Sequence, residues 1–579
     1  LLTATPMFNR AEEIVDLMNF LLINDNRSLL KVNDLFENGS ITKKGKEKLI
    51  SKISGYVSYL RGENPINFPQ KLDPINYYKG KYPSYDIKGR ELDKSQHIKF
   101  LKIIECEMMG LHWEVYQKYF DKSKGEENYF DTVGLQVCNI VFDEDLTTKK
   151  DDIKYLDYYY GTKGFKKNID VSLSKDKQLS FSFKNDMIKE NFKLENFKNL
   201  SSKMYKIISG IEKSKGISFV YSQFKWGGVY PLAIALEMLG YSNYGKKNIL
   251  PSSYNIKKNG KKYLLITGDS NEDFIKYKKI EHNNKDGDLL KVILGTKAAG
   301  EGLNILYVRE VHVLEPWFHL NRLEQVIGRG IRNCSHKDIE EKERNVTVYL
   351  YTVMEPKTKE REIRETLDMK LYRQAEEKID KIGKVMEIIK ASSIDCHLNK
   401  EGNLYLGSKW NTPIDMVDSR GNKRKVIVED KPYSNVCNYQ DKCTNICYPE
   451  GKEVDDSKID NRTYKVEMSY DNIMECYELI KQMFSKLNSN IYFQLVDIVE
   501  YIQDKGLLVD NEIIYHTLNK IIKEKLEILD KYGQKGYLIY RGNLNRQYYI
   551  FQPKNITKEV PLGLRRIKYD SKIKKIKLD

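Results

Sequence analysis

The chain has 579 residues, of which 40% are hydrophobic and 31% are charged, ordinary values for a folded, soluble protein. The length favours three or more domains over one hydrophobic core, and no apolar run approaches the ~20 residues that cross a membrane. With 97 Lys and Arg against 82 Asp and Glu, the net charge of +15 favours a polyanionic partner without requiring one.

The first residues have the pattern of a domain interior. Leu1 and Leu2 precede Thr3-Ala4-Thr5-Pro6, and apolar residues then recur at helical spacing from Ile14 to Leu21. A strand end followed by a helix is typical of α/β folds. We therefore expect further sequence upstream of Leu1, and an intracellular protein, because the chain shows no signal peptide.

Residues 39–205 predict an irregular connector with an inserted region. Its first half is rich in Lys, Gly, Pro and Asn, which interrupt long regular elements. Its most apolar stretch, 135–142, is strand-like and is followed by Asp143-Glu144, as in a Walker B strand. We reject that assignment, because a Walker B strand must precede the Thr-Ala-Thr segment and this stretch follows it.

Alternating strands and helices return after residue 206 and predict a parallel sheet flanked by helices. The expected strands are 217–223, 263–267, 289–295, 308–314 and 347–353, with a helix at 231–239. A long charged helix, 358–390, and a cysteine-bearing stretch follow. The expected domains are 1–38 (end of a first lobe), 39–205, 206–356 (second lobe), 357–487 (accessory region), 488–553 and 554–579 (basic tail).

Residues 488–553 predict a winged-helix-like module. Two amphipathic helices, 493–503 and 510–525, precede a hairpin of 536–540 and 547–552 that turns at Gly542-Asn543. The pattern fits a structural or protein-binding role as well as groove recognition. The tail has nine Lys and Arg against three acids, which suits either an arm that neutralises phosphates or a solvated end.

Two segments of the second lobe carry the chemistry. The run Gly295-Thr-Lys-Ala-Ala-Gly-Glu-Gly-Leu-Asn304 follows a strand, so backbone and the Thr296 hydroxyl can approach a phosphate without obstruction by Cβ atoms. About twenty residues later, 325–332 reads Gln-Val-Ile-Gly-Arg-Gly-Ile-Arg. We expect Arg329 and Arg332 on one helix face, reaching a γ-phosphate bidentately; the alternative is that they only form surface ion pairs.

These segments resemble motifs V and VI of superfamily 2 helicases, with 219–224 resembling motif IV and 2–6 resembling motif III. The resemblance implies a RecA-like second lobe. It implies catalytic roles for Gln325, Arg329 and Arg332; ATP binding or coupling by Gly300, Glu301, Gly302, Asn304, Thr3, Ala4 and Thr5; and nucleic-acid binding by Thr296, Ser222 and Gln223.

Motifs I and II, which hold ATP phosphates and Mg²⁺, should lie upstream of Leu1. Two near matches to a Walker A loop, 39–46 and 240–247, lack the required spacing or the Mg²⁺-binding hydroxyl. We therefore expect the chain by itself to be inactive as an ATPase, with most Mg²⁺ ligands elsewhere.

A narrower resemblance is carried by 3–9, 57–65 with Phe68-Pro69, and 331–336. These segments are similar to helicases of large nucleocytoplasmic DNA viruses, the family of the poxvirus-type early transcription factor small subunit and nucleoside triphosphatase. The resemblance implies an ATP-dependent enzyme acting on DNA rather than RNA in viral transcription. It also implies a viral RNA polymerase or a second transcription factor subunit as partner, no membrane, and a location in the virion or cytoplasmic virus factory.

Two other functions stay open. One is a transcription initiation factor subunit that binds promoter DNA without acting as a motor, and the other is a basic scaffold protein. Upstream sequence separates the first from a motor, because only a motor needs an intact phosphate loop and acid pair.

The cysteines between residues 396 and 447 pose a separate question. Cys396, Cys437, Cys443 and Cys447 could supply four ligands to a structural Zn²⁺, although close Cys-x-x-Cys pairs are missing. The alternative is a set of partly buried thiols in a reducing compartment, as we expect of Cys106, Cys138 and Cys476.

Overall fold

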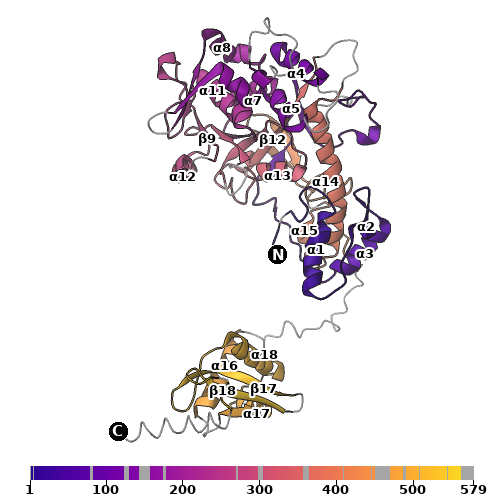
Figure 1. Ribbon diagram of the computed structural model, residues 1–579, viewed down its shortest axis with the longest axis vertical. Helices are drawn as coiled ribbons and strands as arrows, with labels where there is room; N and C mark the ends of the chain where they lie inside the picture. The colour runs from indigo at the N-terminus through magenta and orange to yellow at the C-terminus, as the bar shows by residue number, and fades with distance from the viewer. Residues whose placement is uncertain are drawn as a thin grey trace. The chain divides into compact units, whose positions relative to one another are not determined.

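The computed structural model describes residues 2–3, 5–77, 83–122, 130–142, 157–173, 178–268, 272–297, 304–356, 364–408, 410–444, 446–449, 470–486, 491–507, 509–543, 546–557 and 559–561. The chain divides into two compact units, Leu1–Gly451 (unit 1) and Lys452–Asp579 (unit 2), shown in Figure 1. Among the described residues, no helix is long and apolar enough to span a membrane.

Unit 1 is built on an eight-stranded sheet in the described part of the chain. Its order is β3-β12-β11-β7-β10-β9-β8, with β4 also paired to β12, and every pairing is parallel. The strands are β3 (Gln70–Leu72), β4 (Ile103–Glu107), β7 (Ile217–Tyr221), β8 (Ser242–Asn243), β9 (Lys262–Ile266), β10 (Val292–Gly295), β11 (Val308–Val313) and β12 (Asn345–Met354). The predicted α/β class and the five predicted strands of the second lobe are confirmed.

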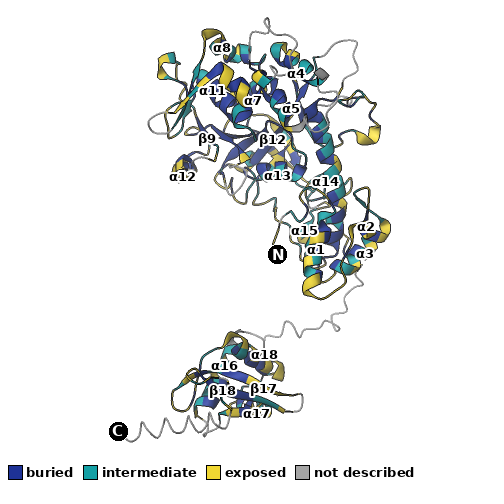
Figure 2. Cartoon of the chain, viewed as in Figure 1, coloured by how far each residue is buried: buried dark blue, intermediate teal, exposed yellow. Residues whose placement is uncertain are grey.

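The central strands are buried on both faces, as their continuous apolar sequences predict. Along β7, Phe219 enters one hydrophobic core and the next residue, Val220, enters the other, because successive side chains point to opposite faces. The sheet is flanked by α10 (Ser202–Lys213), α11 (Tyr230–Met238), α12 (Glu272–Lys278) and α13 (Leu320–Ile327). Figure 2 shows buried residues concentrated in this layer.

The predicted connector is more ordered than its composition indicated. It supplies β3 and β4 to the sheet, together with α3 (Lys43–Ile53), α4 (Gly110–Lys122), α5 (Phe130–Asn139), α7 (Gly161–Asn168), α8 (Asp186–Asn191), α9 (Leu194–Phe197) and the hairpin β5 (Ile169–Leu173) and β6 (Leu179–Phe183). The strand expected at 135–142 is wrong, because α5 covers its first half. A short apolar run that is buried on all sides can form either a strand or a helix, and the sequence pattern does not decide between them. This run lies between two hydrophobic cores.

A long helix, α14 (Leu367–Ala391), joins the sheet to the N-terminal elements. It shares a core with α1 (Glu13–Asn24) and α3, and α2 (Val32–Leu35), β1 (Phe36–Glu37) and β2 (Ser40–Ile41) pack beside them. Figure 1 shows these short elements gathered around the lower end of α14. The predicted helix at 358–390 is therefore confirmed over most of its length.

The accessory region docks on the sheet through a buried charge network. After α15 (Lys400–Asn403), the hairpin of β13 (Pro413–Val417) and β14 (Lys423–Ile427) turns at Arg420. The Arg420 Nε donates to Glu310 Oε1 at 2.9 Å, and His312 Nε2 lies 2.9 Å from the other carboxylate oxygen. Burial opposes ionisation, yet these partners lower the pKa of Glu310 to about 2, so the carboxylate stays charged and holds the hairpin.

Unit 2 has the order of elements of a winged helix. It contains α16 (Tyr470–Lys486), β15 (Tyr492–Gln494), α17 (Leu495–Asp504), α18 (Asn511–Glu524), β16 (Ile528–Leu529), β17 (Lys535–Asn543) and β18 (Arg546–Pro553), with antiparallel sheet order β15-β18-β17-β16. Its own core includes Cys476, Ile480 and Phe484 of α16, a helix that the sequence placed in the accessory region. Beyond residue 561, the predicted basic tail lies outside the described residues.

Candidate functional site

Polar residues follow three neighbouring strands at one edge of the sheet. β7 leads into Ser222, β10 into Thr296, and β11 leads through Leu314 into Glu315. Because β11, β7 and β10 are adjacent and parallel, their carboxyl ends meet. Open parallel sheets bind ligands at this edge. The structure therefore brings together two predicted nucleic-acid-binding positions and one acid that the sequence analysis missed.

Glu315 organises the predicted motif IV loop. Its carboxylate accepts hydrogen bonds from the Ser222 hydroxyl at 3.2 Å, from the Gln223 backbone N–H, and from Asn139 Nδ2 at 3.0 Å. Burial raises the pKa of Glu315. The Ser222 side chain is fully buried in this network, whereas Gln223 is partly exposed. Gln223 is thus the more accessible of the two, and its contact with nucleic acid stays a prediction.

Thr296 begins the predicted motif V. It is 4% exposed, its N–H donates to the Ile266 carbonyl at 3.0 Å, and its hydroxyl lies 3.4 Å from the same oxygen. Asn304 ends the motif, and its carbonyl accepts from Lys278 Nζ at 3.0 Å. Between them, the predicted coupling residues Gly300, Glu301 and Gly302 lie outside the described residues.

The two arginines of the predicted motif VI do not lie on a helix, so that expectation is wrong. Helix α13 ends at Ile327, and Arg329 and Arg332 lie in the turn that follows. The turn packs tightly on β11: a Cβ at Gly330 would lie 2.9 Å from a Val308 side-chain carbon. Only glycine fits this approach, and the arginines are held by the turn rather than by helical periodicity.

The arginine turn presents polar groups in a buried setting. Arg329 is 9% exposed, Gln325 is partly exposed on α13, and Arg332 follows the close contact with β11. The Arg332 Nε is buried and has no hydrogen-bond acceptor among the described residues. A buried guanidinium donor requires an acceptor, and phosphate oxygens suit its planar fork.

The residues that directly follow the predicted motif III segment contact the start of α13. Asn321 Nδ2 donates to the carbonyls of Met7 at 2.9 Å and Phe8 at 3.0 Å. The Phe8 ring lies 4.2 Å from the His319 ring. Thr3 and Thr5 are joined by a local hydrogen bond of 3.1 Å, while Ala4 lies outside the described residues. The structure thus places the residues that follow the segment resembling motif III against α13, the helix in which the segment resembling motif VI begins, through an asparagine that the sequence analysis missed.

The predicted zinc ligands are paired in disulfides instead. Cys396 is bonded to Cys447, and Cys437 to Cys443. The zinc prediction is therefore corrected, because disulfide sulfurs cannot act as thiolate ligands. In the described part of the chain, no cluster of three or more His, Cys, Asp or Glu residues could hold a metal ion. The expectation of buried free thiols is confirmed for Cys106, Cys138 and Cys476.

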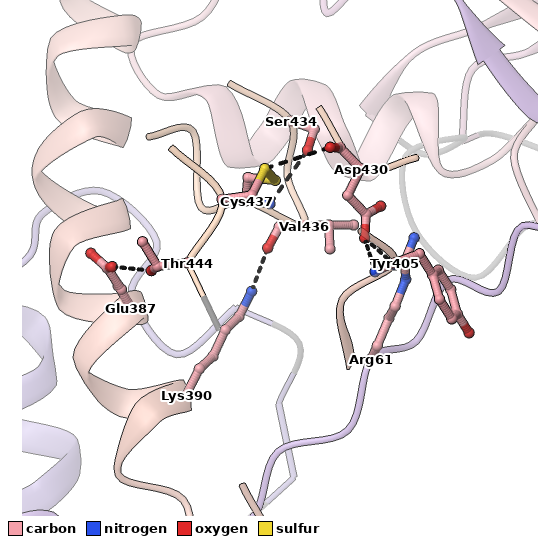
Figure 3. Close-up of a disulfide and its surroundings, with 10 residues drawn as sticks. Arg61, Glu387, Lys390, Tyr405, Asp430, Ser434, Val436, Cys437 and Thr444 are labelled. Atoms are coloured by element: carbon pink, nitrogen blue, oxygen red, sulfur yellow. Dashed lines mark hydrogen bonds and ion pairs between the residues drawn. A yellow bond between two sulfur atoms is a disulfide. The ribbon is translucent and has the colours of Figure 1, made fainter. Parts of the chain in front are cut away.

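Both disulfides lie within the accessory region, close to its contacts with neighbouring segments. Figure 3 shows the Cys437 disulfide beside α14, where Lys390 Nζ donates to the Val436 carbonyl at 3.1 Å. Nearby, Arg61 of the connector and Asp430 form a buried ion pair of 2.6 Å. Burial lowers the pKa of Lys390 to about 8. These contacts stabilise the packing of three segments distant in sequence.

Comparison with known proteins agrees with this geometry. Residues 238–334, which include β9, β10, β11 and α13, match the helicase conserved C-terminal domain. A solved structure, the C-terminal part of the Fun30 ATPase domain, aligns with 51% of this chain at 13% identity. Its TM-score of 0.23 is too low to add to the observed sheet topology. Residues 238–334 thus resemble a helicase C-terminal domain.

Several related sequences are viral. The chain is 26% identical over 99% of its length to the putative ATP-dependent RNA helicase L377 of Acanthamoeba polyphaga mimivirus, covering 54% of that protein. It is 29% identical over 71% of its length to the putative ATP-dependent RNA helicase R563 of the same virus, covering 62% of it. Over 70% of its length it is 25% identical to termination factor NPH-I homologues of African swine fever virus, covering 58%. The chain is related to helicases of large DNA viruses and spans little more than half of these relatives.

Proposed function

We propose that this chain forms the second ATPase lobe and accessory part of an ATP-dependent superfamily 2 helicase or translocase that acts on DNA during viral transcription. The observation that carries the proposal is the buried Arg332 Nε, which lacks an acceptor within the described residues, in the turn after α13. A γ-phosphate bound against this turn would supply that acceptor. Arginine there offsets the charge that develops during phosphoryl transfer, a contribution of about 10³ to 10⁵ in rate.

The path of the chain supports coupling between ATP and nucleic acid. Thr296 follows β10 at the carboxyl edge of the sheet, whereas Asn304 precedes β11 at the opposite edge. There, Val308 packs against the arginine turn. The segment resembling motif V therefore connects the edge proposed to grip nucleic acid with the turn proposed to contact ATP.

Contacts between α13 and the N-terminal segment support a second route. Asn321 holds the Met7 and Phe8 carbonyls, and Lys378 Nζ of α14 donates to Asn9 Oδ1 at 3.0 Å. The residues that follow the segment resembling motif III are thus tied to the helix that precedes Arg329 and Arg332. We infer that hydrolysis and movement on the strand are coupled through these hydrogen bonds.

The test is ATP hydrolysis by the full-length protein with and without DNA. Arg332→Ala should lower kcat by about 10³ with little change in DNA affinity, because the arginine acts on the transition state. Arg90→Ala is the matched control, since this arginine side chain is 74% exposed and, within the described residues, forms a local ion pair with Asp86. Unchanged turnover in Arg332→Ala would refute the proposed role.

The same assay tests whether DNA or RNA stimulates ATP hydrolysis and whether the protein acts as a motor. Stronger stimulation by DNA than by an RNA of equal length supports the DNA assignment, and the reverse result would contradict it. A viral RNA polymerase or a second transcription factor subunit is the proposed protein partner. A second candidate function is promoter binding without motor activity, which the winged-helix order of unit 2 favours. An inactive full-length ATPase that still binds promoter DNA would select it.

A further inference from the structure

A cavity of about 610 Å³ lies in unit 1, between the sheet and two segments from distant parts of the chain. Residues within 61–73 and 99–102 of the connector line one part of it, and residues within 426–439 of the accessory region line another. Ligand-binding cavities in proteins typically have volumes of about 300 to 1,000 Å³. This cavity is therefore large enough for a small organic molecule, and none of the predicted site residues lines it.

One side of the cavity is apolar and is formed by α13 and β12. Leu320, Leu323 and Ile327 recur at helical spacing, so they lie on one face of α13. Val348 and Leu350 are alternate residues of β12 and point to the same face of the sheet. All five side chains belong to one hydrophobic core of unit 1. A bound molecule would bury its apolar part against them.

Aromatic rings line a second side of the cavity. The Phe100 ring stacks with the rings of Tyr433 and Tyr439, at centroid distances of 5.2 and 5.7 Å. Glu376 of α14 positions this segment, because its carboxylate accepts hydrogen bonds from the backbone N–H groups of Phe100 at 2.9 Å and Leu101 at 3.0 Å. Aromatic surfaces of this kind suit a planar ring, and their faces also attract cations.

The two tyrosines are held in place by the backbone of their loop. Tyr433 and Tyr439 have φ angles of 60° and 56°, in the left-handed region that tyrosine rarely adopts. Strained conformations of this kind persist only where the surrounding structure enforces them. Here the loop packs against α14 at Gly383, where a Cβ would lie 1.9 Å from the Asn438 carbonyl oxygen. The aromatic side of the cavity is therefore formed before any ligand binds.

Carboxylates outnumber cations at one end of the cavity. Lys71 pairs with Glu324 of α13 at 3.1 Å, and Glu63 and Asp73 lie close enough for their charges to act on the same lysine. Although desolvation opposes its charge, these three carboxylates raise the pKa of Lys71. The Glu63 carboxylate forms no hydrogen bond or ion pair within the described residues, and desolvation together with the Glu324 charge raises its pKa. One lysine thus faces three carboxylates.

Arg61 does not supply the missing cation. Its guanidinium pairs with Asp430 at 2.6 Å and lies 4.4 Å from the centroid of the Tyr405 ring. Figure 3 shows Arg61 beside these two residues. The Glu63 carboxylate is therefore left to interact with a cation from outside the chain.

The Tyr439 hydroxyl at the same end also lacks a partner. The residue is 7% exposed, and its hydroxyl is buried without a hydrogen bond within the described residues, although the Glu324 carboxylate lies nearby. Burial raises the pKa of Tyr439, so the phenol stays protonated and can both donate and accept. Buried polar groups normally have a partner, and a ligand in the cavity would provide one.

We propose that this cavity is a binding site for a small cationic amine that carries an aromatic ring. The ring lies between the apolar face of α13 and Phe100, and the ammonium group donates to the Glu63 carboxylate and to the Tyr439 hydroxyl oxygen. Hydrogen bonds of an ammonium to a carboxylate are stronger than those between neutral groups. Gly328 and Ile331 of the arginine turn also line the cavity, so the ligand contacts this turn. The proposal concerns binding and does not require ATP hydrolysis.

The experiment uses the chain of residues 1–579 and two probes with the same ring and opposite charges, tryptamine and indoleacetate. The anionic probe is included because Lys99 and Lys431 also line the cavity. Ligand-observed NMR titration should give a Kd of about 1 mM or lower for tryptamine, as for a ligand of about twelve non-hydrogen atoms. Indoleacetate should bind at least about tenfold more weakly, because its charge is repelled by the carboxylates. Amide hydrogen exchange within 320–331 and 433–439 should slow when tryptamine is added.

Two substitutions locate the ammonium group. Glu63→Gln should weaken tryptamine binding about tenfold, because it replaces an ionised acceptor with a neutral one of similar shape. Tyr439→Phe keeps the ring and should weaken binding about threefold or more. Glu47→Gln makes the same chemical change at an exposed position on α3, outside the cavity, and should leave binding unchanged. Thermal melts should show that all three variants remain folded, because neither the Glu63 carboxylate nor the Tyr439 hydroxyl has a hydrogen bond to lose within the described residues.

Any of three outcomes would overturn the proposal. The first is binding of indoleacetate as tight as that of tryptamine. The second is an equal effect of Glu63→Gln and Glu47→Gln, which would show that Glu63 does not hold the ammonium group. The third is absence of tryptamine binding by the folded chain. No outcome depends on ATP hydrolysis, so failure of the proposed ATPase would leave these results unaffected.

Discussion

Removal of one buried lysine should destabilise unit 1 severely. Lys203 of α10 and Asp368 of α14 form an ion pair of 2.8 Å with both side chains 0% exposed, and Asp368 also accepts the Val353 N–H of β12 at 3.0 Å. Lys203→Met leaves the carboxylate buried without its cation. Loss of one partner of a buried pair costs about 3 to 5 kcal/mol. We expect this reduction in the free energy of unfolding, measured by urea denaturation at about pH 8.

A second substitution and the pH dependence separate this mechanism from loss of packing. Burial already raises the pKa of Asp368. Without Lys203 the folded pKa rises further, so the penalty is present at high pH and decreases as falling pH protonates the carboxyl. Adding Asp368→Asn removes the charge and should recover most of the stability. A loss below about 1 kcal/mol in Lys203→Met, or no recovery in the double variant, would refute the reasoning.

Three further predictions concern other contacts. Asn321→Ala removes two hydrogen bonds to the N-terminal segment, so it should lower the free energy of unfolding by about 1 to 3 kcal/mol. It should also reduce the stimulation of ATP hydrolysis by DNA in the full-length protein, and undiminished stimulation would contradict the coupling role. Burial raises the pKa of Glu237 from 4.5 to about 7, so the free energy of unfolding should fall by up to about 3 kcal/mol as the pH rises between these values. In thermal melts, Glu237→Gln should remove this pH dependence. The Cys396–Cys447 disulfide closes a segment of 51 residues and the Cys437–Cys443 disulfide one of 6. In denaturation under non-reducing conditions, Cys396→Ser should therefore lower the free energy of unfolding by about 4 kcal/mol and Cys437→Ser by about 2 kcal/mol. Equal losses would argue against the chain-entropy explanation.

The sequence by itself determined the local elements of the second lobe and of unit 2. The apolar runs at β7, β10 and β11 predict buried parallel strands, because each run is long enough and is bounded by Gly or polar residues. The two helices and the hairpin of unit 2 follow from amphipathic spacing and a Gly-Asn turn signal, although Gly542 and Asn543, where the turn was expected, are paired within β17. The order and spacing of the motif-like segments also indicated Arg329 and Arg332 as functional residues, because order and spacing are read directly from the sequence.

The tertiary structure decided what depends on contacts between distant residues. Pairing of β3 and β4 with β12 could not be foreseen, because short strands in a Pro-rich segment gain their stability from the sheet they join. Glu315 and Asn321 looked ordinary in sequence, and only the meeting of β11 with β7, and of α13 with the N-terminal segment, gave them partners. The cysteines paired because chain folding brought residues 396 and 447 together, a distance in space that spacing along the chain does not encode.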